Sequence, residues 1–386
     1  MLDHRASLVY HPDLLRYDFG PYHPLRPERI TASLDLLIKA RLWDADAELL
    51  TPIPATEAEL ELVHDRAFIQ AVQRAGGGEL AGTQQQAAFG LSSSDNPPFP
   101  DMHYAAALVA CGSVQAARQI MNGGLDHAFN PAGGLHHASR GRASGFCIYN
   151  DPAVAAAVAV REFDARVAYV DFDCHHGDGV QWIFYDRPEV LTISFHESGR
   201  WLFPGTGDVD ETGEAAGQGY SINVPFAPFT QDDSWLEAMH SVVPALIARF
   251  KPDLLISSHG CDTHEYDPLT HLSLSTRSFV AQAQLLHQLA HQHCDGRWLA
   301  VGSGGYDWRR VVPRSWAIVW AEMTCRQLDE TLPTTWLDAW TEPGEEPLPR
   351  TFADPAEEQR QMPRKSEIEE INRAVVRAVR RLADLA

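Results

Sequence analysis

The sequence predicts a three-layer α/β/α protein built on a central, mainly parallel sheet. Short apolar runs recur between residues 128 and 301, and stretches with helical periodicity separate them. Strands that alternate with helices are typical of a parallel sheet covered on both faces. The composition agrees, because 45% hydrophobic residues and 22% charged residues are close to the average of globular proteins. At 386 residues, length alone would permit one large domain or two to three smaller ones.

Each element of this fold is expected from a particular run of residues. We expect strands at Val167–Val170, Val190–Ser194, Ser221–Val224, Leu254–Ser258 and Trp298–Val301, with a shorter apolar segment around Ala128–Phe129. We expect helices at Tyr104–Met121, Asp151–Glu162, Trp235–Phe250 and Thr276–His293. In open parallel sheets ligands bind at the carboxyl ends of the strands, so the polar residues after each run are the candidate functional residues.

Two stretches look unlike core. Residues 76–101 are rich in Gly, Gln, Ser and Pro and predict a surface loop, and residues 341–366 predict a tether. From Lys365 to Ala386 the apolar residues recur every three or four positions, which predicts an amphipathic helix packed on the domain. Its apolar positions are Ile368, Ile371, Val375, Val379 and Leu382. We therefore divide the chain into a catalytic domain, residues 1–340, and a linker with a terminal helix, residues 341–386.

Charge and cysteine usage restrict the class of protein. The net charge is 31 − 52 = −21, which repels polyanions and argues against a nucleic-acid partner, while a basic segment or a cationic amine would be attracted. The six cysteines lack C-x-x-C spacing and predict free thiols in a reducing compartment. The first seven residues contain no apolar signal region and no run of 18 apolar residues occurs, so we expect a soluble cytoplasmic protein without a membrane partner. The sequence predicts no oligomeric state.

A divalent metal site is predicted from residues that follow two of the strands. In an extended segment after Val170, Asp171, Asp173 and His175 would emerge on one face, because side chains alternate along a strand. Asp262 follows another buried strand and supplies a further carboxylate. With Asp173, His175 and Asp262 as ligands, a zinc or similar ion keeps one open position, as catalytic metals do.

Two more loops carry side chains suited to the same cavity. His136 and His137 follow a glycine pair, and each needs a carboxylate to fix its tautomer, for which Asp171 and Asp178 remain. Tyr306 follows Gly304 and Gly305 after another strand, and its phenol is a good donor to a developing oxyanion.

Other histidines are expected to be structural. His287, His291 and His293 lie on one predicted helix, where we find no matching acid partners.

Together these motifs resemble the histone deacetylase superfamily in order and spacing over about residues 7–325. The matching segments are Gly134-Leu-His136-His137, Gly145-Phe146-Cys147, Asp171-x-Asp173-x-His175-His176-Gly-Asp178-Gly, Pro204-Gly-Thr-Gly207, Gly260-x-Asp262 and Gly304-Gly305-Tyr306. Residues 261–272 and 306–314 more narrowly resemble the bacterial acetoin-utilisation deacetylases. The resemblance implies a single-domain fold of the arginase/deacetylase type.

The resemblance also implies roles for individual residues. Asp173, His175 and Asp262 would hold one zinc ion, His137 with Asp178 would be the general base and then the acid, and His136 with Asp171 would orient the water. Tyr306 would donate to the carbonyl oxygen. The substrate-binding residues implied are Asp95 at the rim, Gly145, Phe146, Phe203 and Leu269 along the acyl-lysine tunnel, and Arg29 in an internal cavity for released acetate. A potassium ion would lie near Asp171, Asp173, His175, Ser194 and Phe195. Two departures are His259, where many eukaryotic members have Cys, and Ser303, which interrupts the glycine run.

The implied function is zinc-dependent hydrolysis of the amide of N-acetyl-lysine in a protein, with release of acetate. Deacetylation of acetylpolyamines or other small amines is the alternative with the same chemistry, although no insertion or extra acid restricts the tunnel to polyamines. A non-catalytic acyl-lysine-binding protein is a second alternative. An arginase-like enzyme with two manganese ions is a third, but Gly177 and Gly260 stand where a second metal would need carboxylates.

Overall fold

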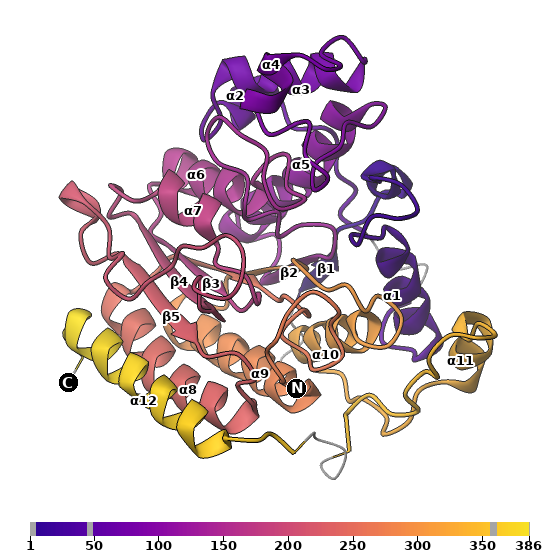
Figure 1. The fold of residues 1–386 in the computed structure, drawn as a ribbon, viewed down its shortest axis with the longest axis vertical. Helices are drawn as coiled ribbons and strands as arrows, with labels where there is room; N and C mark the ends of the chain where they lie inside the picture. Colours follow the sequence, from indigo (N-terminus) through magenta and orange to yellow (C-terminus); the bar gives the residue numbers. More distant parts are fainter. Residues whose placement is uncertain (1–4, 45–48, 356–360, 386) are drawn as a thin grey trace.

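The computed structural model describes residues 5–44, 49–355 and 361–385. In this part of the chain, seven strands form one sheet in the order β1-β2-β7-β6-β3-β4-β5, and every neighbouring pair is parallel (Figure 1). The strands are β1 (Ala6–Leu8), β2 (His127–Asn130), β3 (Val167–Asp171), β4 (Val190–Glu197), β5 (Ser221–Phe226), β6 (Leu254–Ser258) and β7 (Trp298–Val301). The predicted fold class is confirmed.

Helices cover the sheet on both faces, which makes three layers. Helices α5 (Met102–Met121), α6 (Asp151–Phe163) and α7 (Asp178–Ile183) lie on one side, and α8 (Asp232–Phe250), α9 (Thr276–His293) and α10 (Val312–Met323) lie on the other (Figure 1). The remaining helices are α1 (Glu28–Lys39), α2 (Glu57–Leu60), α3 (Arg66–Gly76), α4 (Gln84–Ala88), α11 (Thr334–Trp340), α12 (Lys365–Leu382) and the 3₁₀ segments Pro12–Arg16 and Ala215–Gly217. The strands are buried on both faces, and for that reason they read as continuous apolar runs.

The elements that were predicted match the structure closely, but strand β1 and several helices, among them α1, α3 and α10, were not predicted. The expected helix Thr276–His293 has the bounds of α9, and Ser275 caps it by accepting a hydrogen bond from the Arg277 amide. Strand β1 was not predicted, because three residues are too few to show a period.

Residues 76–101 are more ordered than the predicted surface loop. They contain helix α4, whose cap Thr83 accepts a hydrogen bond from the Gln86 amide. Leu80 and Leu91 are buried in the core. The expectation of a simple loop was wrong here. The high Gly, Gln and Ser content indicated a loop, although the segment contains a short helix and two buried leucines.

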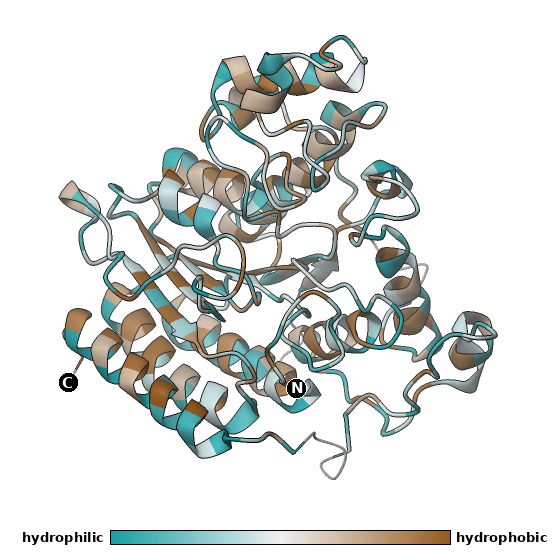
Figure 2. Ribbon diagram, in the orientation of Figure 1, coloured by the Kyte–Doolittle hydropathy of each residue, from teal (hydrophilic) through white to brown (hydrophobic). Residues whose placement is uncertain are grey.

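Helix α12 packs against α8 and β5 and is amphipathic, with brown and teal segments alternating along it in Figure 2. Val379 is buried, but Ile371 and Leu382 remain about half exposed, at 54% and 48%. The buried polar anchor is Asn372, which accepts a hydrogen bond from the Ala227 amide and donates to Thr230 and Ser234. The predicted apolar stripe is therefore only partly the packed face. The division of the chain at residue 340 stays a prediction.

All six cysteines are free, as expected. Among the described residues, no helix combines the length and apolar character needed to cross a bilayer.

Candidate active site

The candidate site lies at the carboxyl edge of the sheet. The segments that follow β2, β3, β6 and β7 meet there, because all four strands are parallel and adjacent or nearly so in the sheet order. They bring together the predicted histidine pair, the predicted metal ligands and the predicted tyrosine.

Asp173, His175 and Asp262 form a buried three-donor cluster. The Nδ1 atom of His175 lies 3.1 Å from an Asp173 oxygen (Oδ1) and 2.9 Å from an Asp262 oxygen (Oδ2). Donor atoms about 2.0–2.2 Å from one tetrahedral zinc ion lie about 3.3–3.6 Å from one another, which is close to these separations. The cluster is a candidate site for one divalent metal.

Two backbone amides and one side-chain hydroxyl hold the two carboxylates in place. The Gly304 amide and the Ser303 hydroxyl donate to Oδ2 of Asp173, and the Cys174 amide donates to Oδ1 of Asp262. The other oxygen of each carboxylate faces His175. Burial and the neighbouring charge of Asp173 raise the pKa of Asp262 to about 6. Because two buried carboxylates repel each other, a cation between them relieves this cost, and the donor set therefore fits zinc.

These side chains converge through a turn and not, as predicted, along one extended segment. Strand β3 ends at Asp171, so Asp171, Asp173 and His175 do not emerge from one extended face. Instead the chain turns: Asp171 accepts a hydrogen bond from the Asp173 amide, and Asp173 accepts one from the His175 amide. The turn aims Asp171 at His136 and leaves Asp173 and His175 for the metal cluster.

His136 and His137 each have one carboxylate partner. Asp171 lies 2.7 Å from Nδ1 of His136, and Asp178 lies 2.6 Å from Nδ1 of His137. The Nε2 atoms of the two rings are 3.0 Å apart and face each other. Both rings are buried, and both residues line the same cavity.

The two histidines differ in charge. Burial acts to lower the pKa of His136, but the charges of Asp171 and Asp173 outweigh it and raise the value to about 9. Burial and the charge of His136 lower the pKa of His137 to about 4, against the effect of Asp178. At pH 7 a charged His136 therefore stands beside a neutral His137, which can accept a proton.

Two residues that the sequence reasoning missed hold the histidine loop. Asp151 is fully buried and accepts hydrogen bonds from the Gly134 and Leu135 amides. Asn150 donates to the carbonyl groups of His136 and Ala138. Their signal in the sequence was an ordinary helix start, since Asn150 also caps α6, and that reading concealed their second contact.

Tyr306 lines the same cavity as His136, His137 and Asp173. Asp267, another residue that the sequence reasoning missed, accepts a hydrogen bond from the Tyr306 amide at 2.9 Å. Burial and the charges of Asp262 and Asp173 raise the pKa of the phenol well above its usual value, so it remains protonated. Ser303 is more than a departure from the glycine run, because its hydroxyl donates to Asp173 at 2.8 Å.

Aromatic rings and a glycine surround the approach to the cluster. The ring of Phe146 lies 5.7 Å from that of Tyr306, and the ring of Phe203 lies 5.0 Å from that of His137. A Cβ atom on Gly145 would lie 2.4 Å from His137 and 2.9 Å from Phe203, so no larger residue fits there. Phe203 and Leu269 are 42% and 37% exposed, which places them at an outer surface.

The other predicted residues lie around this cavity. Asp95 is exposed, and its carbonyl group lies 3.2 Å from His23, whose ring contacts Phe146. Arg29 is buried, donates to the Ser303 carbonyl and lines both the cavity at the histidine pair and a second cavity.

Of the residues predicted around a potassium ion, Asp171 and Ser194 are neighbours on β3 and β4. The Phe195 ring packs in the core against Phe172, so only its backbone could contact an ion.

An all-parallel α/β fold with a buried Asp-His-Asp cluster, beside a histidine pair and a phenol, defines a class of protein with a candidate divalent metal centre. Comparison with known proteins gives the family. Residues 23–323 match the model of the histone deacetylase domain, and the chain belongs to this family.

Individual relatives cover almost the whole chain. The acetoin utilization protein AcuC of Bacillus subtilis (strain 168) is 47% identical over 371 residues, covering 96% of this chain and 95% of the relative. AcuC of Staphylococcus aureus (strain MSSA476) is 37% identical over 370 residues, covering 96% and 95%. Among solved structures, a histone deacetylase homolog from Aquifex aeolicus is similar with a TM-score of 0.84 and 28% identity, covering 96% of this chain and 100% of that one. A structure of such a homolog complexed with SAHA has a TM-score of 0.83, 28% identity and the same coverage.

Proposed function

We propose that this protein hydrolyses the amide of N-acetyl-lysine in proteins, using one zinc ion held by Asp173, His175 and Asp262. The observation that carries the proposal is that three groups meet around one cavity, which Asp173, His136, His137 and Tyr306 line. The three groups are the buried three-donor cluster, a histidine pair of unequal pKa and the protonated Tyr306 phenol. Membership of the histone deacetylase family supports the same chemistry.

The amide is a poor electrophile, and its amine is a poor leaving group. Zinc, when bound, polarises the carbonyl group and lowers the pKa of the attacking water. His137 is neutral at pH 7 and takes the proton of that water at its Nε2 atom, while Asp178 stabilises the imidazolium that forms. His136 stays charged beside it and orients the water.

Tyr306 completes the reaction site. Its phenol donates a hydrogen bond to the oxyanion that develops on the carbonyl oxygen. The proton now on His137 passes to the departing amine, which leaves free lysine and acetate.

The walls of the cavity fit a long, apolar acyl-lysine stem. Phe146 and Phe203 flank the stem, Leu269 lies beside it at the surface, and Gly145 leaves room between His137 and Phe203. Asp95 at the rim accepts hydrogen bonds from the substrate backbone. Arg29 attracts the released acetate into the second cavity, since this residue lines both cavities. A potassium ion near Asp171, Asp173, His175, Ser194 and Phe195 would offset the buried acidic charge.

Protein lysine is the favoured substrate, and acetylated small amines are the alternative. The similarity to AcuC over 96% of the chain supports a bacterial deacetylase whose natural substrate need not be a histone. The net charge of −21 favours a cationic partner of either kind. A cytoplasmic location agrees with six free cysteines.

Two glycines argue against an arginase-like site with two metal ions, because neither position has room for a side chain. A Cβ atom on Gly177 would lie 2.4 Å from Asp171, and one on Gly260 would lie 2.4 Å from the Cα atom of Asp173. Neither position can hold the carboxylate that a second ion in this site would need.

The test compares turnover across substrates on one zinc-loaded sample. We expect hydrolysis of acetyl-lysine peptides to exceed that of acetylated small amines, to stop with a chelator and to return when zinc is added. SAHA, present in a similar solved structure, is expected to compete with the peptide. Binding of the peptide without any hydrolysis would instead support the non-catalytic alternative, and faster hydrolysis of the small amines would support the polyamine alternative.

A further inference from the structure

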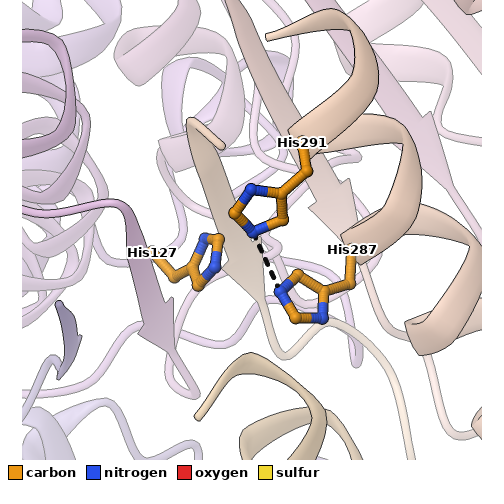
Figure 3. A group of neighbouring side chains, drawn as sticks. All are labelled: His127, His287 and His291. Atoms are coloured by element: carbon orange, nitrogen blue, oxygen red, sulfur yellow. Dashed lines mark hydrogen bonds between the residues drawn. The ribbon is translucent and has the colours of Figure 1, made fainter. Parts of the chain in front are cut away.

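A second cluster of possible metal ligands lies at the opposite edge of the sheet. His127 is the first residue of β2, while His287 and His291 lie on α9, and one ring nitrogen of each lies within 4.8 Å of the others (Figure 3). Because β2 is parallel to β3 and β6, its first residue is at the amino edge, away from Asp173 and Asp262. The two clusters share no residue.

The ring geometry matches three imidazoles around one ion. The ring centroids are separated by 5.0 Å between His127 and His287, 5.2 Å between His127 and His291, and 4.9 Å between His287 and His291. Imidazoles that bind one tetrahedral ion through nitrogens about 2.1 Å away have centroids about 5 Å apart. The Nε2 atoms of His287 and His291 are already 3.1 Å apart, close to the separation of two ligands on one ion. Figure 3 shows His127 facing the gap between the two helix side chains.

Neighbouring residues fix the orientation of His287. Its Nδ1 atom lies 2.8 Å from the Glu322 carboxylate on α10, which leaves Nε2 to face His291. A carboxylate behind a histidine ligand is the usual arrangement at protein metal sites, because it fixes the tautomer and raises the basicity of the ligand. The Trp298 ring stacks on His287 at 5.8 Å and meets His127 at 5.7 Å. The expectation that this helix offers no acid partner was therefore wrong for His287, because Glu322 comes from a different helix.

We propose that His127, His287 and His291 form a second divalent metal site, which takes zinc or a similar imidazole-binding ion and links β2 to α9. His127 is buried and His291 is exposed, so the ion would reach the site from solvent and keep a fourth position for water. The proposal does not depend on the deacetylase function.

The test counts zinc ions per chain in zinc-saturated protein after gel filtration. Wild type should hold two ions, His291→Ala one and Asp262→Ala one, and the double variant none. His293→Ala is the matched control, because it removes an imidazole from the same helix outside the cluster, and it should hold two. Turnover of His291→Ala should equal that of wild type, since the exposed side chain lies away from the candidate active site.

Thermal stability gives a second readout that activity does not influence. Added zinc should raise the melting temperature of Asp262→Ala, which keeps only the histidine cluster, and should leave the double variant unchanged. The same zinc content in wild type and His291→Ala would overturn the proposal, as would loss of both ions in Asp262→Ala. If the histidine site binds its ion but wild type shows no turnover, the proposed deacetylase function fails and this inference stands.

Discussion

Tyr306 is the side chain whose replacement tests the proposed chemistry most directly. Its phenol stays protonated because burial and the charges of Asp262 and Asp173 raise its pKa. Tyr306→Phe should lower kcat for an acetyl-lysine peptide by about 10²- to 10³-fold, since one oxyanion donor is lost. Zinc content and melting temperature serve as controls and should not change. A variant with wild-type turnover would show that the phenol has no role in the reaction.

Gly304 tests how closely the backbone must approach the metal ligands. A Cβ atom there would lie 2.3 Å from Asp262 and 2.6 Å from Asp173, so Gly304→Ala must displace at least one carboxylate. We expect zinc affinity to fall by about 10-fold or more, measured by chelator competition in the His291→Ala background, where one ion is followed.

The control for this change is Gly77→Ala. Gly77 has a helical backbone with φ −85°, and its nearest atom would be 3.6 Å from the new Cβ, so zinc affinity should not change. Equal affinities in the two variants would mean that the Gly304 loop does not constrain the ligands.

The candidate ligands could be proposed from the sequence, because Asp173, His175 and Asp262 follow predicted buried strands, and parallel strands bring their carboxyl ends to one edge of the sheet. Their supports could not be predicted in the same way. Asp151 and Asn150 read as the start of a helix, and Ser303 read as a departure from a glycine run, yet all three bond to the site. These contacts join residues distant in the chain, and no local pattern reports them.

The segment after α11 is anchored by Asp354. Its carboxylate accepts hydrogen bonds from His264, Arg314 and the Thr276 amide, so it ties the segment before α12 to the loop after β6 and to helices α9 and α10. Burial acts to raise the pKa of Asp354, but these hydrogen bonds outweigh it and hold the pKa well below its usual value. Composition predicted residues 341–366 to be a tether, but the ion pair between Asp354 and Arg314 attaches part of this segment to the domain.

Asp354→Asn should lower the free energy of unfolding at pH 7 by about 3 to 5 kcal/mol, because it leaves the buried Arg314 without its carboxylate. A lowered pKa stabilises the fold at pH values above the unfolded-state pKa of about 4, and this contribution is lost as the pH falls below it. The difference between variant and wild type in urea unfolding should therefore shrink from pH 7 to pH 3. Asp295→Asn, an exposed control with a side chain 87% accessible, should change stability by less than about 1 kcal/mol. A difference that does not depend on pH would contradict the assigned charge.

Helix α12 depends on a polar anchor that periodicity could not reveal. Asn372 is buried and bonds to Ala227, Thr230 and Ser234. Asn372→Ala should cost about 1 to 3 kcal/mol of unfolding free energy, because the buried groups lose their partner. Ile371→Ala, at a neighbouring position that is 54% exposed, should stay within about 0.5 kcal/mol. Equal effects of the two substitutions would show that α12 docks through its apolar residues alone.

At the scale of the whole molecule, the negative net charge is expected to affect how fast charged substrates bind. With −21 charges, the protein should attract cationic peptides, and salt should screen this attraction. Raising the ionic strength should lower kcat/KM several-fold for a lysine-rich acetylated peptide and leave an uncharged acetylated peptide nearly unaffected in the same buffers. Equal salt responses for both peptides would argue against electrostatic attraction.

The parallel topology explains why so much of the architecture could be predicted. Every strand between β2 and β7 that the apolar runs predicted is present, and parallel pairing brings their carboxyl ends to one edge. The same topology creates a second edge, where His127 meets His287 and His291. That meeting was not predicted, because His127 is separated from the helix histidines by more than 150 residues and only the sheet order brings them together.

The proposed chemistry requires one divalent ion bound where the segments after β3 and β6 meet. Anomalous diffraction at the zinc absorption edge, from crystals of the zinc-loaded protein, locates each ion directly. We predict a peak within coordination distance of Asp173, His175 and Asp262, and a separate one among His127, His287 and His291. Zinc-loaded crystals with no peak at the first position would contradict the proposed active site.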